Sequence, residues 1–142
     1  MLNKIELKEK IRALAEEMNQ DMVNFLGDLI RIQSYTSQEA PAVERTLTEL
    51  RKIGCEEVWV DSAGNALGRI GKGKRIIMFN AHLDTNEVSD ASQWPHPPLE
   101  PVVEDGILYG LGASDCKAGV ASIVYGAAIL NKLGLLEDVS VV

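Results

Sequence analysis

The spacing of apolar residues changes near Gly54. Before that point apolar side chains recur every three or four residues, which predicts an amphipathic helix over 11–32 and a second helix after it. Gly27 lies inside the first helix and indicates that another segment packs closely there. After Gly54, short apolar runs separated by glycine and asparagine predict strands. Helices followed by strands bury their apolar faces by packing in layers, so the sequence predicts an α/β fold.

The start of the second helix has two interpretations. Thr36 and Glu39 have the spacing of a capping box, which would begin the helix near Thr36. Pro41 favours a start nearer Ala40, because proline is best tolerated in the first helical turn. Gly54 is placed to end this helix.

The predicted strands are short runs rich in apolar residues, at 58–60, 66–70, 75–80, 107–109 and 139–142. Residues 75–80 lack alternation, which predicts a strand buried on both faces. The glycines and lysines of 71–74 are interpreted as a hairpin turn. Residues 118–133 predict a helix that is apolar nearly all round and therefore buried. Together these elements predict a three-layer αβα sandwich with a mixed, mostly parallel sheet, formed by residues 1–142 as part of one domain.

Composition excludes some partners. The net charge of −7 argues against nucleic acid, because phosphate binding needs a basic face. No apolar run has membrane-spanning length, so no membrane partner is expected. Cys55 and Cys116 are too few for a disulfide framework, and we expect two reduced thiols in a cytoplasmic protein.

The first candidate for chemistry is the pair His82 and Asp84, which follows the strand predicted at 75–80. If that strand continues, the two side chains point to the same face, just beyond its carboxyl end, where α/β sheets bind ligands. A neutral imidazole is a good zinc ligand, and a nearby carboxylate can fix its ring. The alternative is a surface histidine in a loop with an aspartate that serves the turn.

The second candidate is Asp115, at the junction between a short strand and a helix. Gly110 and Gly112 supply two glycines of a dinucleotide fingerprint, but Asp115 occupies the third position, where a carboxylate would repel a pyrophosphate. The glycines are better explained as a tight turn that presents Asp115 to a site. The alternative is that Asp115 is only a helix N-cap.

Together these segments resemble the dizinc amidohydrolases of the acetylornithine deacetylase, succinyl-diaminopimelate desuccinylase, aminoacylase and glutamate carboxypeptidase family. The matching stretches are 25–34, 61–65, 81–85, Trp94 with Pro98 and Leu99, and 105–119. The run over 109–136 is also similar to a subgroup of selenium-metabolism-linked hydrolases. The resemblance extends over nearly all of the chain and implies the N-terminal part of a zinc-peptidase-like catalytic domain.

The resemblance assigns roles to the candidate residues. His82 would bind one metal ion, Asp115 would bridge two, and Asp84 would be the catalytic-site residue that orients the His82 ring. It also implies a cis peptide bond after Asp115. The chain departs from the family at Leu111, where arginine is usual, and at Cys116, where methionine is frequent. Neither departure removes a ligand.

The implied function is metal-dependent hydrolysis of amides, by a deacylase or peptidase acting on N-acyl amino acids or short peptides. The implied cofactors are two divalent ions, zinc or alternatively cobalt, which polarise the amide carbonyl and acidify a water. The family's general base, its remaining ligands and its lid or dimerisation domain have no counterpart in residues 1–142. We therefore expect this fragment alone to be inactive, to bind zinc weakly and to self-associate. The competing interpretation is a non-catalytic binding or scaffold module, or a pseudogene product.

Overall fold

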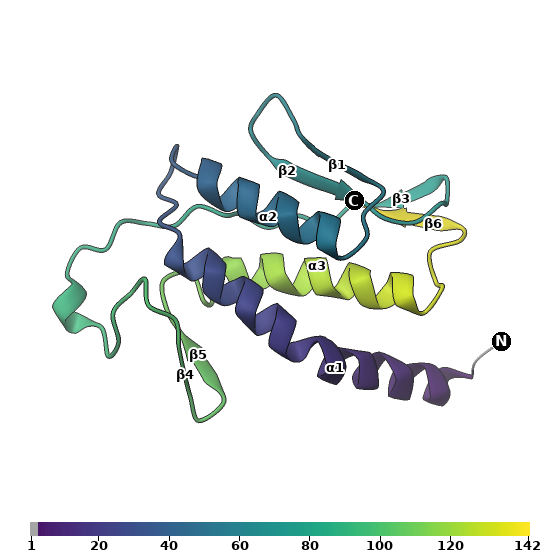
Figure 1. Ribbon diagram of the computed structural model, residues 1–142, viewed down its shortest axis with the longest axis horizontal. Coiled ribbons are helices and arrows are strands. Elements are labelled where there is room, and N and C mark those ends of the chain that lie inside the picture. Colours follow the sequence, from purple (N-terminus) through teal and green to yellow (C-terminus); the bar gives the residue numbers. More distant parts are fainter. Residues whose placement is uncertain (1–2) are drawn as a thin grey trace.

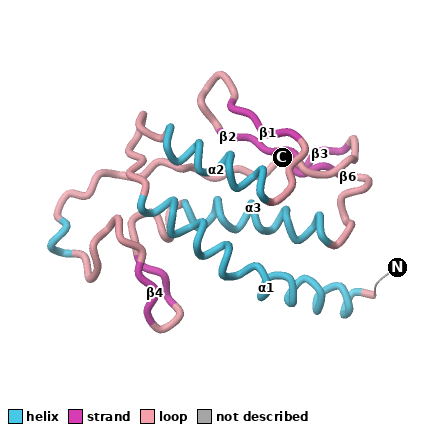
Figure 2. The backbone as a smooth tube through the Cα atoms, in the orientation of Figure 1, coloured by secondary structure: helices cyan, strands magenta, loops and turns pink. Residues whose placement is uncertain are grey.

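The computed structural model describes residues 3–142 and has helices packed beside short strands (Figure 1). The helices are α1 (Lys4–Arg31), α2 (Ala40–Lys52) and α3 (Lys117–Lys132), with a short 3-10 helix η1 (Ala91–Gln93). The strands are β1 (Glu57–Val60), β2 (Ala66–Arg69), β3 (Arg75–Ile77), β4 (Val102–Glu104), β5 (Ile107–Tyr109) and β6 (Val139–Val141). Figure 2 shows that most of the chain between β3 and β4 is loop, apart from η1.

Helix α1 begins earlier than its apolar spacing predicts. The Asn3 side chain accepts hydrogen bonds from the backbone N–H groups of Ile5 and Glu6, and the Glu6 carboxylate accepts one from the Asn3 backbone N–H. This capping box stabilises a first turn whose residues are mostly exposed, so apolar periodicity does not reveal it. Pro101 packs against Gly27, as the glycine indicated, at 3.6 Å from the position of a Cβ. Within residues 3–142, no helix combines the length and apolar character needed to cross a membrane.

Helix α2 begins at Ala40 with Pro41 in its first turn, so the proline interpretation is confirmed. The capping box of Thr36 and Glu39 is not formed, because Glu39 makes no side-chain cap bond and the Thr36 hydroxyl donates to Asp84 instead. The helix ends as predicted, before Gly54, whose φ of +92° favours glycine.

The strands pair into small two-stranded sheets, both antiparallel and parallel. β1 and β2 pair antiparallel, and β3 and β6 pair parallel. A bridge between Ile70 and Val141 joins β2 to β6, so β6 lies between β2 and β3. The mixed α/β class is therefore confirmed, whereas the hairpin turn predicted at 71–74 is wrong. β4 and β5 form a separate antiparallel hairpin, and the sequence had indicated only its second strand.

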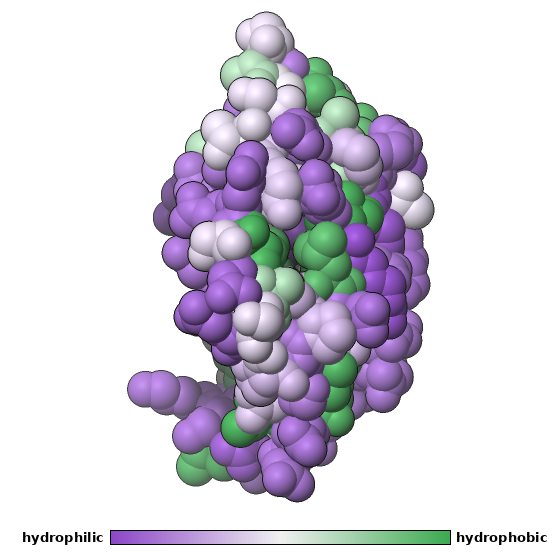
Figure 3. Space-filling model, turned by 90° about the vertical axis from the view of Figure 1, so that its left-hand side faces the viewer, coloured by the Kyte–Doolittle hydropathy of each residue, from purple (hydrophilic) through white to green (hydrophobic). Residues whose placement is uncertain are grey.

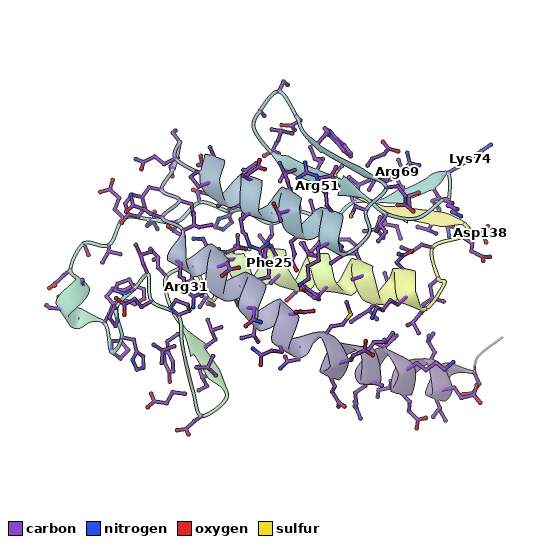
Figure 4. The ribbon with its side chains drawn as sticks, in the orientation of Figure 1. Phe25, Arg31, Arg51, Arg69, Lys74 and Asp138 are labelled. Carbon is purple, nitrogen blue, oxygen red and sulfur yellow. The ribbon has the colours of Figure 1, made fainter. Side chains whose placement is uncertain are left out.

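The connection between β2 and β3 passes directly against the start of β6. A Cβ on Gly73 would lie 1.9 Å from the carbonyl carbon of Asp138, so no larger residue fits there. The buried Ser140 hydroxyl donates to the backbone oxygens of Gly71 at 3.1 Å and Gly73 at 2.6 Å. Figure 4 labels Lys74 and Asp138 at this end of the sheet. Gly71 and Gly73 therefore allow the chain to pack closely against β6, and they do not form a hairpin turn.

Residues 75–80 differ from the predicted strand that is buried on both faces. The regular strand ends at Ile77. The apolar side chains in this strand and directly after it are exposed: Ile76 by 54%, Met78 by 66% and Phe79 by 50%. The expected burial on both faces is therefore wrong for the described part of the chain, because its helices pack against the sheet elsewhere.

The main core lies where α1, α2 and α3 meet. Phe25 is fully buried there and points from α1 toward the other helices (Figure 4). Its ring lies 6.5 Å from that of Tyr125 on α3 and 4.8 Å from the guanidinium carbon of Arg45 on α2. A second cluster consists of Ile70, Ala127, Leu136 and Val141 and joins α3 to the sheet. Helix α3 is thus the buried helix that its composition predicted.

Candidate metal centre

The segment that carries His82 and Asp84 lies against the end of α1. The backbone N–H of Thr85 donates to the Ser34 carbonyl at 2.9 Å, and the Ser34 hydroxyl donates to the Leu83 carbonyl at 2.7 Å. Both Ser34 and Thr85 are buried, so these bonds are shielded from water. They fix the backbone on either side of Asp84, in a stretch that belongs to no regular strand.

The structure brings His82, Asp84 and Asp115 together. The Nδ1 atom of His82 lies 3.0 Å from the backbone oxygen of Asp84 and 3.2 Å from its Oδ1. The Nε2 atom lies 2.9 Å from Oδ1 of Asp115. Thr36 donates to Oδ2 of Asp84 at 3.1 Å and so holds that carboxylate from its other side. The structure therefore places these three residues side by side, although the strand before them ends earlier than expected.

Both ring nitrogens of His82 face oxygen acceptors. A neutral imidazole has one donor and one acceptor nitrogen, so only the protonated ring satisfies both contacts. The hydrogen bond that the Asp115 carboxylate accepts accordingly raises the pKa of His82 above 6.5, and the backbone oxygen of Asp84 acts in the same direction. Nε2 of His82 and Oδ1 of Asp115 are the types of nitrogen and oxygen donor that bind a zinc ion.

Asp115 is presented by the turn between β5 and α3. The turn uses Gly110 at φ +154° and Gly112 at φ +80°. The N–H of Leu111 donates to the Pro98 carbonyl at 2.7 Å, which attaches the turn to the long loop. As the resemblance implied, the peptide bond between Asp115 and the next residue is cis.

The N-cap interpretation of Asp115 is wrong. The N-cap of α3 is Cys116, which makes no side-chain cap bond. The Asp115 side chain is 88% exposed and has a hydrogen bond only to His82 among the described residues. Its carboxylate is therefore free to bind a ligand.

Lys117 is a structural residue of the site that the sequence reasoning missed. It is fully buried, and its Nζ donates to the carbonyl oxygens of Leu29 at 2.6 Å and Ile32 at 2.9 Å, at the end of α1. The last carbonyls of a helix lack partners within the helix and favour a cation. Burial lowers the pKa of Lys117 to about 8. The signal in the sequence was a lysine at the start of an otherwise apolar helix, two residues after Asp115.

His96 is held away from these contacts. Its Nε2 lies 3.3 Å from the Glu104 carboxylate, and its ring lies 4.9 Å from that of Tyr109. These contacts attach the long loop to the β4–β5 hairpin. The end of the molecule where α1 ends and α3 begins is mostly hydrophilic, with hydrophobic side chains gathered near its middle (Figure 3).

The comparison that decides the family involves the segment just described. Residues 78–142 match the family model of peptidase family M20/M25/M40. These residues belong to that family. His82, Asp84 and Asp115 all lie inside the matched segment. The resemblance drawn from the sequence is thereby confirmed.

Curated relatives and solved structures agree with the M20 assignment. The chain is 36% identical over 124 residues to the uncharacterized protein YgeY of Escherichia coli K12 and covers 31% of that protein. It is 37% identical over 98 residues, or 68% of its length, to succinyl-diaminopimelate desuccinylase of Alkalilimnicola ehrlichii and covers 26% of that enzyme. The M20 family metallo-carboxypeptidase Sso-CP2 of Sulfolobus solfataricus has the same fold, with a TM-score of 0.74 and 19% identity over 84% of this chain and 29% of its own. The chain thus spans less than a third of these proteins.

Proposed function

We propose that this chain is the N-terminal part of a metal-dependent amidohydrolase, in which His82 and Asp115 hold metal and Asp84 positions His82. The observation that supports it most directly is the 2.9 Å contact between Nε2 of His82 and Oδ1 of Asp115, within a segment of the M20 family. The contact joins two kinds of donor that bind zinc, and the carboxylate is largely exposed to incoming ions.

Each residue has a defined task in this proposal. Asp115 offers two carboxylate oxygens, so it is able to bridge two ions, while His82 offers Nε2 to one of them. Asp84 accepts the hydrogen bond from Nδ1, which fixes the ring and keeps the proton off Nε2. Two zinc ions, when bound, would polarise the scissile carbonyl and acidify a water.

The substrate class follows from the relatives. One is named a desuccinylase and another a metallo-carboxypeptidase, and both names refer to cleavage of an acyl–nitrogen bond. We propose an N-acyl amino acid or a short peptide as substrate. Because a catalytic zinc usually has three protein ligands, we also propose that residues 1–142 alone bind zinc weakly and are inactive.

The test uses the full-length protein that contains these residues. After removal of metal, zinc should restore amide hydrolysis in the wild type but not in His82→Ala or Asp115→Ala, because each variant loses a direct ligand. Asp84→Asn should weaken zinc binding by about 10–100-fold, the usual loss for a residue that orients a ligand. Zinc affinity is measured by calorimetry, and hydrolysis on a panel of N-acyl amino acids and dipeptides.

His96→Ala is the matched control, since that histidine is held by Glu104 and Tyr109 instead. It should keep wild-type zinc affinity and activity. Full activity in His82→Ala or Asp115→Ala would reject the assignment. Zinc binding without hydrolysis of any tested amide would favour a non-catalytic binding module.

A further inference from the structure

We propose that Lys117 is a positioning residue of the metal centre, which sets the placement of His82 relative to Asp115 through the end of α1. The inference rests on the proposed function, because it concerns how these two residues are held. Lys117 makes contacts in two directions. Its backbone N–H bonds within the turn that carries Asp115, and its side chain reaches the end of α1.

The backbone of Lys117 holds the turn between β5 and α3. Its N–H donates to the Gly112 carbonyl at 3.0 Å, and this bond spans the part of the turn that contains Asp115. Gly112 lies between two side chains, since a Cβ on it would be 3.0 Å from Cδ of Lys117 and 3.1 Å from Cγ2 of Thr85. The turn is therefore packed between the lysine and the segment that follows His82.

The side chain of Lys117 holds the end of α1. It is fully buried, and its Nζ donates to the carbonyl oxygens of Leu29 at 2.6 Å and Ile32 at 2.9 Å. Burial of an ammonium group costs free energy unless the group is hydrogen-bonded, and an apolar side chain of similar length would avoid that cost. What the ammonium group adds is the pair of hydrogen bonds, which attach the last carbonyls of α1 to the start of α3.

The end of α1 in turn holds the segment of His82. Ser34 lies two residues beyond Ile32 and is fully buried. Its hydroxyl donates to the Leu83 carbonyl at 2.7 Å, and its carbonyl accepts from the Thr85 N–H at 2.9 Å. A shift of the α1 end therefore moves the backbone beside His82 relative to the turn between β5 and α3.

Small displacements matter at this centre, because metal ligands must be held within about 0.5 Å of their working positions. The contact between Nε2 of His82 and Oδ1 of Asp115 joins side chains 33 residues apart in the sequence. Lys117 connects the two segments from behind, without contributing a ligand atom. Loss of its hydrogen bonds should therefore weaken metal binding, as loss of other residues that orient a ligand does.

Lys117→Met in the full-length protein tests the proposal, because methionine nearly keeps the length of the side chain but lacks the ammonium group. Its affinity for zinc, measured by calorimetry, should fall by about tenfold or more. The absorption spectrum of bound cobalt(II), which reports the ligand geometry, should shift, whereas a loss of stability alone would leave it unchanged. Lys132→Met is the matched control at the other end of α3, where the lysine pairs with Glu17 at 3.0 Å. It should keep both the affinity and the spectrum.

Ser34→Ala tests the same series of contacts from its other end, and it decides the outcome if Lys117→Met does not fold. It should also lower the affinity for zinc. Thr46→Val is its control, because it removes a buried hydroxyl that donates to the Ala42 carbonyl within α2, and it should leave the affinity unchanged.

In the double variant of Lys117→Met and Ser34→Ala, the combined loss of affinity should be smaller than the sum of the single losses, because both changes release the end of α1. Fully additive losses would contradict a shared path. Unchanged affinity in both single variants, with zinc binding that still depends on His82, would overturn this inference alone. Absence of any zinc binding that depends on His82 would overturn the proposed function as well.

Discussion

His82 is the residue on which the site depends most, because both of its ring nitrogens are occupied. Nε2 lies beside Oδ1 of Asp115, and Nδ1 lies beside the backbone oxygen of Asp84. The carboxylate that would bind an ion thus also stabilises the protonated ring. Proton and metal compete for one position, so metal binding at this centre should weaken as the pH falls.

We expect His82 in the metal-free protein to titrate above its ordinary pKa of 6.5, chiefly because the Asp115 carboxylate accepts a hydrogen bond from its ring. The folded state then binds more protons than the unfolded state just above pH 6.5. The hydrogen bond between His82 and Asp115 therefore stabilises the fold fully below that pH. Its contribution is lost as the pH rises through the pKa of His82 in the folded state. NMR titration of the ring protons measures the pKa directly.

Asp115→Asn should move the pKa of His82 down toward 6.5, and Asp84→Asn should move it less. Asp105→Asn is the control, because Asp105 lies in the turn between β4 and β5, at φ +51°, a conformation that asparagine tolerates. An unchanged pKa in Asp115→Asn would contradict the interpretation.

At the scale of elements, α2 and α3 are joined by a buried charge. Glu49 is 1% exposed and accepts a hydrogen bond from the Tyr125 hydroxyl at 2.5 Å. Arg45 donates to the same carboxylate at 2.7 Å, and Lys52 lies 3.4 Å from it. A buried carboxylate costs free energy unless it is paired and hydrogen-bonded, and these partners supply both. The network fixes how the helices that flank the site pack together.

Tyr125→Phe should lower the free energy of unfolding by about 1.5–3 kcal/mol, because it removes a buried hydrogen bond to a charged group. Urea denaturation followed by circular dichroism measures the change. Tyr35→Phe makes the same deletion where the hydroxyl has no hydrogen bond among the described residues, so its effect should be small. Equal losses in both variants would argue against a specific role for the network.

At the scale of the whole molecule, residues 76–79, in β3 and directly after it, have exposed apolar side chains. Ile76, Met78 and Phe79 are each half exposed or more. Contiguous apolar surface of this kind is typical of a face that another protein surface covers. Among the described strands, β3 pairs only with β6. The other edge of β3 therefore has backbone N–H and C=O groups without a strand partner, beside the same residues.

We therefore expect the 142-residue chain to self-associate, with a mass by light scattering above 15.5 kDa that rises with concentration. Met78→Lys or Phe79→Lys should shift it toward the monomer, because a charge opposes burial of this surface. Ile5→Lys is the matched control, since Ile5 is 72% exposed but lies at the other end of the chain, on α1. A strictly monomeric wild type at high concentration would refute the expectation.

The sequence alone determined the features that depend on neighbours along the chain. Apolar spacing indicated the helices, Pro41 and Gly54 marked the ends of α2, and short motifs indicated His82, Asp84 and Asp115 as one site. These signals are local, because caps, helix faces and turns are decided within a few residues.

Only the tertiary structure decided which distant segments meet. It placed β6 between β2 and β3, which turned the predicted hairpin into a connection whose Gly73 packs against Asp138. It also placed the buried Lys117 on the last carbonyls of α1 and left Met78 exposed. Burial and hydrogen bonding between segments far apart in sequence depend on how the elements pack, and no local pattern specifies that packing.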